Sequence, residues 1–380
     1  MIRSIRNAPG FVWGLLALLA LALAPWIWWL AKPEVPLHAI VVDKTVPFPD
    51  YREHKGFMWV LNQQKYTKPN GGAYAYDKDY YGLFPGPDAG NGRGIETFET
   101  KEWRGEGPTP DLVYVTDTYG APTYNVNGVG YGGLTAEDAD ALQSAAEAGA
   151  MLVMEFNSLQ DPTGDEVRTR VESALGVRWT GWIGRYVTEL AGGANEVPGW
   201  AKAAYEANRG EWTFEGAGVV LAHEDGRVVV LEEGVDLGEH GNRVRFTSEG
   251  EAWSGVDRPA YYNTYFDIVE AADGTEALAY HELDATSSGI AKLSAVGLDS
   301  RFPAVLRNVS ETNVSYYFAG DFADFKVASG WDRYAGWERF KAFFTRSRKD
   351  DLESFYWRIY VPMMKAVLRE AADGRSGIDA

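Results

Sequence analysis

The chain opens with one long apolar run and then alternates between short apolar and amphipathic stretches. Phe11–Ala31 carry no charge, and as a helix they would rise about 31 Å, close to the thickness of the hydrocarbon core of a bilayer. Two arginines precede this run, and Trp26, Trp28 and Trp29 lie at its far end, where indole rings favour the headgroup layer. The pattern predicts a single-pass anchor, with residues 1–10 in the cytoplasm and the rest of the chain in the periplasm or on the cell surface.

A cleaved signal peptide is the alternative interpretation of the same run. Ala22-Leu23-Ala24 resembles a small-residue cleavage site. Pro25 follows it directly, and the apolar run continues beyond it, which favours an uncleaved anchor. We therefore expect the membrane to be the first partner of this chain, through Phe11–Ala31.

After a proline-rich linker, short apolar runs that end in a polar residue alternate with stretches of helical spacing. Apolar strands separated by amphipathic helices are typical of the α/β class, with a mostly parallel sheet flanked by helices. Thr135 is the expected N-cap of one helix, and Gly149 is its expected stop. The expected elements are strands over residues 38–43, 111–117 and 151–156 and helices over residues 51–66, 135–148 and 165–175.

Beyond residue 190 the pattern becomes richer in strands. Residues 218–222 and 228–231 predict a β-hairpin with an Asp225-Gly226 turn, which indicates an antiparallel β insertion. Residues 316–321 return to the apolar strand pattern, and two helices are expected near the C-terminus. The predicted organisation is a cytoplasmic N-terminus (1–10), an N-terminal transmembrane helix (11–31), a linker (32–37), an α/β core (38–190), a β-rich insertion or second lobe (191–294), a return to the core sheet (295–330), C-terminal helices (331–370) and a tail (371–380).

Composition and charge exclude several classes of function. The 380 residues are 46% hydrophobic and 24% charged, as in a folded protein. The net charge is −18, and residues 33–380 carry −21 because the first 32 residues hold three basic groups and no acidic one. A nucleic-acid partner is therefore not expected. The chain has no cysteine, which removes thiolate nucleophiles and Cys-ligated metals. No cofactor is expected.

The order of strand, loop, Leu134-Thr135 helix start and strand over 151–156 resembles the class I glutamine amidotransferase-like superfamily, which has a flavodoxin-like fold. The segment 317–321 is similar to the last core strand of that superfamily. The resemblance covers residues 38–190 and 295–325 and implies an extracytoplasmic, membrane-anchored member. Those enzymes carry a cysteine after the strand that here ends at Glu155. Because this chain has none, cysteine-dependent amidotransfer is excluded.

Polar side chains lie at or just past the ends of the expected parallel strands. Asp43, Asp117, Glu155, Asn157 and Asp321 would all reach the same edge of the sheet and meet in one crevice. Paired carboxylates can divide acid and base roles in glycoside hydrolysis. The alternative is that these residues only cap helices and support turns, as Asp and Asn commonly do.

Further ionisable candidates are found later in the chain. His281-Glu282-Leu283-Asp284 is the densest cluster, so Glu282 joins Asp117 and Glu155 as a candidate catalytic residue. The five histidines show no zinc-binding spacing, and no metal site is predicted. Ser158 lacks the glycines of a nucleophile elbow.

Aromatic residues make up 14% of the chain, and many fall in residues 68–107, which are expected to form a long loop. Tyrosine and tryptophan beside Asp and Asn suit stacking on sugar rings, although they also pack cores. The candidate ligand-binding residues are Asp43, Tyr80, Trp103, Tyr119, Asn157 and Asp321.

Three functions fit these observations. The first is an anchored, non-catalytic domain that binds a polysaccharide or a partner protein, as in cell-envelope polysaccharide assembly or export. The second is a carboxylate-dependent glycan hydrolase. The third is a structural subunit of a membrane complex, which predicts a stable protein partner and no bound sugar.

Overall fold

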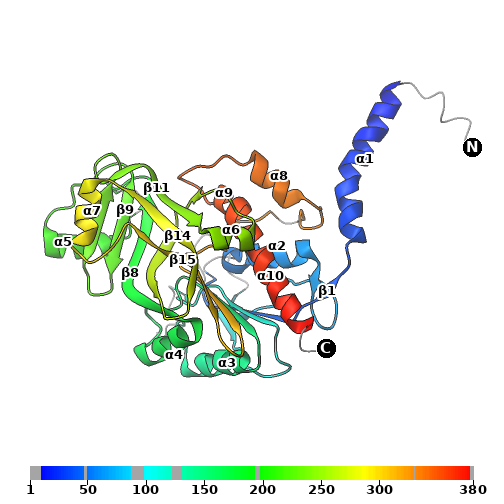
Figure 1. The fold of residues 1–380 in the computed structure, drawn as a ribbon, viewed down its shortest axis with the longest axis horizontal. Helices are drawn as coiled ribbons and strands as arrows, with labels where there is room; N and C mark the ends of the chain where they lie inside the picture. The colour runs from blue at the N-terminus through cyan, green and yellow to red at the C-terminus, as the bar shows by residue number, and fades with distance from the viewer. Residues whose placement is uncertain are drawn as a thin grey trace, which may run out of the picture.

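The protein is described by a computed structural model over residues 10–46, 49–86, 98–121, 131–192, 197–328 and 330–376. The two arginines on which the predicted orientation of the anchor rests and the last residues of the predicted tail lie outside these ranges. Figure 1 shows one long helix standing apart from a globular part. The described residues form a ten-stranded, a four-stranded and a two-stranded sheet.

The predicted apolar helix is present as α1 (Gly10–Ala31). Within the described ranges it is the one helix long and apolar enough to cross a membrane, a property that a signal sequence would share. Its side chains have no cover from the rest of the chain over most of its length. The helix ends where Lys32 begins the polar linker, which contains the short strand β1 (Val35–Pro36), paired with β3 (Tyr66–Thr67).

The central sheet has ten strands among the described residues and is mixed. Its middle is parallel, with β16, β7, β6, β2 and β4 side by side, and every other pairing is antiparallel. In sheet order the strands are β12 (Ala260–Tyr261), β11 (Leu237–Phe246), β14 (Glu276–Ala285), β15 (Arg301–Val309), β16 (Val314–Phe318), β7 (Met151–Glu155), β6 (Leu112–Val115), β2 (Ala39–Asp43), β4 (Tyr81–Pro85) and β5 (Phe98–Lys101).

Helices cover both faces of the parallel strands, so their side chains are buried on each side. On β2, Val41 packs on the side of α2 (Arg52–Gln64) and α10 (Val361–Ser376). Ile40 and Val42 pack on the side of α3 (Ala136–Glu147) and α4 (Asp165–Leu175). This two-sided burial explains why these strands are continuous apolar runs in the sequence.

The second sheet is antiparallel and has four strands in the order β10, β9, β8, β13. The predicted hairpin is confirmed, with Gly226 at a φ of 89° in the turn between β9 and β10. Its strands are β8 (Val177–Val187), β9 (Gly218–His223), β10 (Val228–Glu232) and β13 (Tyr265–Ala271). Helices α5 (Gly199–Arg209) and α7 (Ser287–Ser294) pack on β10, whereas α6 (Ser248–Ser254) packs on β11 and β14 of the central sheet.

The C-terminal part of the chain is helical, as predicted. It contains α8 (Trp337–Phe344), α9 (Glu353–Phe355), a π-helical turn over Tyr356–Tyr360, and α10. The π-helical turn is fully or almost fully buried apart from Arg358, and it packs on α2 through the hydroxyl of Tyr356, which donates to Gly56 O at 2.9 Å.

Local signals account for the element ends that were predicted. Thr135 and Asp138 form a reciprocal capping box at the start of α3, and Gly149 follows its end with a φ of 93°. The N-cap of α2 is Tyr51, in a left-handed conformation and without a side-chain cap.

The α/β class is confirmed, but a mostly parallel sheet is not. Four of the nine strand pairings in the described part of the central sheet are parallel, and the other five are antiparallel. The antiparallel half consists of β11, β12, β14 and β15, whose exposed faces carry charged residues and which therefore do not form the apolar runs from which the sheet was predicted.

Candidate functional site

The carboxyl ends of β2, β6 and β7 meet at one edge of the central sheet. Asp43 ends β2, Asp117 follows β6, and Glu155 ends β7. Thr45 links the first two strands: its N–H donates to Asp43 Oδ1 at 2.9 Å and its hydroxyl to Asp117 Oδ1 at 2.6 Å. We call Asp43, Asp117 and Glu155 the inner carboxyls, since all three side chains are buried.

Asp43 is paired with His54, on the first turns of α2. The Asp43 Oδ2 to His54 Nδ1 distance is 2.5 Å, and His54 Nε2 lies 2.7 Å from the carbonyl oxygen of Tyr76. A carbonyl oxygen only accepts, so Nε2 carries a hydrogen. One further proton is held between Nδ1 and Asp43, which makes the pair neutral overall. Burial raises the pKa of Asp43, while His54 and the N–H of Thr45 oppose that rise.

The backbone around Asp43 is tightly packed. Gly82 on β4 has a φ of 124°, and a Cβ atom built on it would lie 1.8 Å from the carbonyl oxygen of Asp43. Only glycine allows β4 to approach β2 this closely. The ring of Tyr80 lies over His54, with their centroids 4.4 Å apart.

Asp117 receives hydrogen bonds at both carboxylate oxygens. Oδ1 accepts from the Thr45 hydroxyl and from the N–H of Tyr119 at 2.8 Å, and Oδ2 accepts from Asn157 Nδ2 at 2.9 Å. Burial raises the pKa of Asp117 to about 7, although these donors lower it. Asn157, with a φ of 68°, therefore holds β7 to the end of β6, as its predicted place at the sheet edge suggested.

Glu155 joins several layers of the fold. Oε1 accepts from the Tyr114 hydroxyl, which also contacts the hydroxyl of Tyr360 at 2.8 Å. Oε2 accepts from the N–H groups of Phe322 and Ala323, each at 3.1 Å. Burial raises the pKa of Glu155 to about 8, against the lowering effect of these three donors. The inner carboxyls are thus occupied by donors from their own chain.

Three more carboxyls, Glu53, Asp321 and Asp324, form an outer group next to the inner one. Burial raises the pKa of Glu53 well above its usual range, and the charges of Asp43 and Asp324 add to the rise. Glu53 is 5% exposed, and its Oε2 has no hydrogen-bond partner among the described residues. We call these three the outer carboxyls.

Asp321 and Asp324 are hydrogen-bonded to each other and only partly buried. Burial raises the pKa of Asp321 well above its usual range, followed by the effect of Asp324. Burial raises the pKa of Asp324 to about 6, while Arg52 and the hydrogen bond from Asp321 lower it. Arg52 Nε lies 3.7 Å from Asp324 Oδ1 and 3.9 Å from Glu53 Oε1. Burial and neighbouring carboxyls therefore raise the pKa of Asp321, whereas Arg52 opposes the rise in the pKa of Asp324.

The predicted aromatic ligand residues differ in accessibility. Tyr119, directly beyond Asp117, is 53% exposed. Tyr80 is fully buried and donates its hydroxyl to Leu83 O at 2.6 Å. Trp103 is buried in the apolar layer between the sheet and α3. Of these three aromatic side chains, Tyr119 alone presents a face to solvent.

Glu282 does not lie with the other candidate catalytic residues. It is on β14, which is separated from β7 by β15 and β16, and it is held between Arg245 at 2.9 Å and Arg301 at 3.6 Å. Its neighbour His281 is buried and bonds to Ala319 O at 2.9 Å, and burial lowers the pKa of His281 to about 3. The ionisable cluster predicted from the sequence therefore lies on one strand, where His281 is buried and Glu282 is paired with two arginines.

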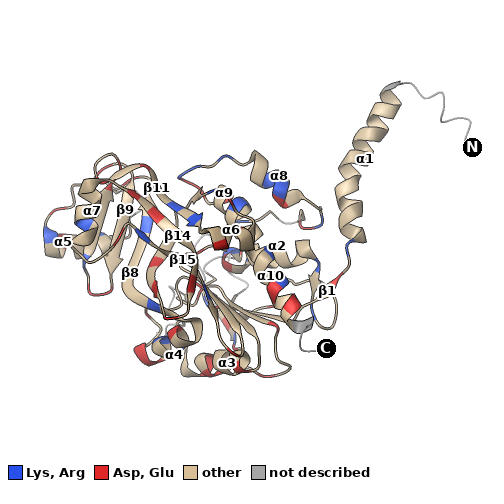
Figure 2. Cartoon of the chain, in the orientation of Figure 1, with Lys and Arg blue, Asp and Glu red and all other residues tan. Residues whose placement is uncertain are grey.

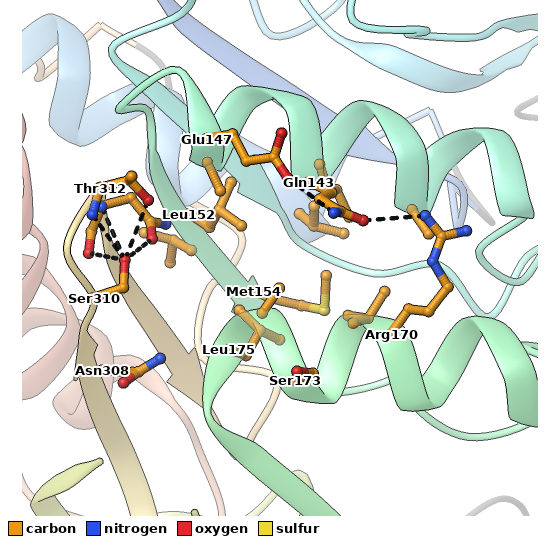
Figure 3. Close-up of a pocket in the computed structure, with 18 of the residues that line it drawn as sticks. Gln143, Glu147, Leu152, Met154, Arg170, Ser173, Leu175, Asn308, Ser310 and Thr312 are labelled. Carbon is orange, nitrogen blue, oxygen red and sulfur yellow. Dashed lines mark hydrogen bonds between the residues drawn. The ribbon is translucent and has the colours of Figure 1, made fainter. Parts of the chain in front are cut away.

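A separate pocket of about 460 Å³ lies on the outer face of the sheet, between α3 and α4. Figure 3 shows Leu152, Met154 and Leu175 in the space between the two helices, with Arg170 and Gln143 joined at one side. None of the inner or outer carboxyls lines it. Within the described residues, no group of three or more His, Asp or Glu side chains is arranged to hold a metal ion.

Sequence reasoning missed Glu53, His54, Asp324, Thr45 and Arg52. Two signals were available: Thr45 follows the strand-end Asp43 by two residues, and Glu53-His54 stands at the start of the next helix. Asp324 follows the last parallel strand, as Asp321 does. His54 was considered only as a zinc ligand, and its pairing with a strand-end carboxyl was not considered.

No protein-family model and no curated protein matches the chain. Among solved structures, the chain is similar to a β-galactosidase from Bacillus circulans sp. alkalophilus, at 13% identity and a TM-score of 0.37 over 76% of this chain and 29% of the other. A cold-adapted β-galactosidase from Rahnella sp. R3 is 10% identical, with a TM-score of 0.38 over 88% of this chain and 31% of the other. An exo-β-1,4-mannosidase from Opitutaceae bacterium strain TAV5 is 8% identical, with a TM-score of 0.32 over 85% of this chain and 35% of the other. The chain spans about a third of the length of each of these glycosidases.

The strand order of the central sheet corrects the resemblance to the class I glutamine amidotransferase-like superfamily. The sheet is mixed, with an antiparallel half that a flavodoxin-like sheet lacks. The order of strand, loop and helix that suggested the resemblance is common to many α/β folds. The missing cysteine remains a fact of the sequence and excludes a thiolate nucleophile in any fold.

Proposed function

We propose that this protein is a membrane-anchored, carboxylate-dependent hydrolase that acts on a carbohydrate. The observation that carries the proposal is the pair Asp321 and Asp324, two partly buried carboxyls after β16, with the guanidinium of Arg52 3.7 Å from Asp324. Two carboxyls with one proton between them can supply an acid and a base at the same pH. The inner carboxyls cannot take these roles without losing the hydrogen bonds that they accept.

In the proposed reaction, Asp324 accepts a proton from a water molecule while the water oxygen attacks the substrate. Asp321 donates its proton to the leaving oxygen or nitrogen, so the pair again holds one proton at the end. Arg52, beside Asp324, favours the ionised form of this carboxyl before the reaction. The two carboxyls lie three residues apart in the chain and affect the pKa values of each other, so in this reaction they act on one water as a unit.

The carbohydrate class is supported by the surroundings of the pair. Carboxylates and the guanidinium of Arg52 are groups that bind sugar hydroxyls, and Tyr119 offers an exposed aromatic face beyond Asp117. The experiment below distinguishes cleavage of a glycosidic bond from cleavage of the bond to an acyl substituent of the sugar. The proposed location is the outer side of the membrane, as the anchor and its flanking residues predict.

A second candidate is binding of a carbohydrate or partner protein without turnover. One observation favours it: the donors on Asp43, Asp117 and Glu155 belong to the chain itself, which is what structural carboxyls require.

The test uses the full chain in lipid nanodiscs with a panel of native and acetylated polysaccharides. Reducing ends and free acetate report turnover, and calorimetry reports binding. We expect the Asp324→Asn variant to lose at least about a hundredfold in rate, the contribution of general acid–base catalysis, with binding retained. Asp299→Asn, an exposed carboxyl on a distant loop, is the control. Binding without turnover by the unsubstituted protein would replace the hydrolase by the second candidate.

A further inference from the structure

Residues 331–349, which we call the aromatic segment, expose a group of large apolar side chains. Phe343 is 79% exposed and Phe344 is 65% exposed, although both belong to α8. Trp331 and Phe340 are also exposed, and Trp331 stacks on Trp337 with centroids 4.1 Å apart. A cluster of this kind on a folded domain marks a surface that is covered by something else.

Elsewhere in the described globular part, the exposed large apolar side chains belong to separate elements. They are Tyr119 after β6, Trp200 on α5, Val235 before β11, Ile290 on α7 and Val309 on β15. Isolated residues of this kind need no explanation. The aromatic segment is therefore distinct among the described residues.

The aromatic segment is joined to the apolar helix α1. The N–H of Ala335 donates to the carbonyl oxygen of Pro25 at 3.1 Å. The base of α1 is fixed to the same region, because Trp29 Nε1 donates to Gln63 O at 3.0 Å and Gln63 Nε2 donates to Glu338 Oε2 at 2.9 Å. Figure 1 shows α8 on the side of the globular part from which α1 rises.

This contact fixes the depth of the segment relative to a bilayer. Pro25 precedes the last residue of α1, Ala31, by six residues, so Ala335 is level with a point about 9 Å inside that end of the helix. A helix that lies in the interface inserts its apolar side chains about 5–10 Å below the headgroups. A bilayer that surrounds α1 therefore reaches the aromatic segment at the depth of an interfacial helix.

The charge of the aromatic segment is opposite to that of the molecule. It contains six Lys and Arg and two Asp and Glu, in a chain of net charge −18. Arg333, Arg339 and Arg346 are exposed and have no ion-pair partner in the described part of the chain. In Figure 2 part of the α8 ribbon has the blue of Lys and Arg. Basic residues beside exposed aromatics are typical of a surface that binds anionic lipid headgroups.

We propose that the aromatic segment is a second membrane contact, which lies in the headgroup layer beside α1 and binds anionic phospholipid. Phe340, Phe343 and Phe344 enter the boundary between headgroups and acyl chains, and Arg339 and Arg346 contact lipid phosphates. The contact adds to the hydrogen bonds between α1 and the globular part and holds the globular part in one orientation against the bilayer. It rests on α1 spanning the membrane, as in the proposed function, but not on hydrolysis.

The absence of cysteine makes a direct test possible, because any introduced cysteine is the only one. Phe343→Cys, Phe344→Cys, Trp200→Cys and Leu18→Cys are each labelled with a nitroxide in the full chain, in nanodiscs of phosphatidylcholine with or without phosphatidylglycerol. The ratio of collision rates with oxygen and with a water-soluble nickel complex reports depth. Trp200, exposed on α5, is the control for a surface in water, and Leu18 is the control for the anchor.

We expect ratios at positions 343 and 344 between those of the two controls, several-fold above position 200, and higher still with phosphatidylglycerol. Adding Arg339→Glu and Arg346→Glu should remove the response to phosphatidylglycerol. If position 18 is in lipid while 343 and 344 match position 200, the inference is wrong and the anchor stands. If position 18 is itself in water, the anchor is wrong and the inference is lost with it.

Discussion

His54 and Asp43 form a buried pair, with Nδ1 and Oδ2 2.5 Å apart, in which one proton serves two side chains that have no exposure to solvent. Removing either side chain leaves the other without its buried hydrogen-bond partner. His54→Leu would leave the Asp43 carboxyl with one N–H donor, from Thr45, and would also leave the carbonyl of Tyr76 without its donor.

We therefore expect His54→Leu to lower the free energy of unfolding by about 3–5 kcal/mol, the usual cost of breaking a buried pair. Asp43→Asn with His54→Leu should cost less than the sum of the single changes, because no unpaired acid remains. Denaturant unfolding of the full chain in detergent measures all three. His240→Leu, at a partly exposed position, is the control and should change stability by less than about 1 kcal/mol. If the changes in the free energy of unfolding of the two single variants add up to that of the double variant, the pairing of His54 and Asp43 is contradicted.

Gly82 gives a second prediction at the same place. Its Cβ would meet the carbonyl oxygen of Asp43 at 1.8 Å, and its φ of 124° is unfavourable for any other residue. Gly82→Ala should therefore separate β4 from β2 and cost more than about 2 kcal/mol. Gly199→Ala, at the start of α5 with no atom within 4 Å of the added methyl group, should be neutral or slightly stabilising. Equal midpoints for the two variants in thermal unfolding would show that the close approach is unimportant.

The inner carboxyls could be predicted from the sequence because they depend on local pattern alone. A buried parallel strand is a continuous apolar run, and the first polar residue after it marks the edge of the sheet, as Asp43, Asp117 and Glu155 do. Asp321 could be predicted in the same way, because it follows the last parallel strand. Glu53 comes from a helix and Asp324 from a loop, so their positions in the sequence bring them near that edge but only the tertiary structure shows that their side chains turn towards it.

The antiparallel half of the fold was hidden for a related reason. On β14, His281 points into the core and Glu282 lies between two arginines on the other face. Buried and half-buried side chains alternate along this part of β14, but the buried His281 is polar like its half-buried neighbour Glu282. The two therefore look in the sequence like a cluster of ionisable side chains, and the sequence predicted a catalytic site there. The long loop expected over residues 68–107 contains β4 and β5, and the Tyr, Gly and Pro of β4 resemble a loop in composition.

The orientation of the globular part gives a third prediction. If α1 spans the membrane with its N-terminus inside, an introduced cysteine at Ile290, which is exposed on α7, should react with a membrane-impermeant maleimide on bacterial spheroplasts. We expect labelling of Ile290→Cys in intact spheroplasts equal to that after lysis. A cysteine in a cytoplasmic reporter protein, labelled only after lysis, is the control. Labelling of Ile290→Cys only after lysis would reverse the proposed topology.

The raised pKa values of the inner carboxyls predict how stability depends on pH. In the unfolded chain Asp and Glu titrate near pH 4, whereas burial raises the pKa of Asp117 to about 7 and of Glu155 to about 8 in the fold. Between these limits the folded state binds more protons than the unfolded state, so stability falls as pH rises from about 4 to about 8.

The Glu155→Gln variant tests, at one residue, whether stability falls as pH rises. The amide keeps an oxygen for the N–H groups of Phe322 and Ala323 and turns its NH₂ towards the Tyr114 hydroxyl, which can accept. We expect unfolding midpoints, measured at pH 5 and at pH 8, to differ less for the variant than for the unsubstituted protein. Glu276→Gln, an exposed carboxyl at the start of β14, should leave the difference unchanged. A stability that rises from pH 5 to pH 8, unaltered by Glu155→Gln, would mean that Glu155 is ionised in the fold and that its three donors outweigh its burial.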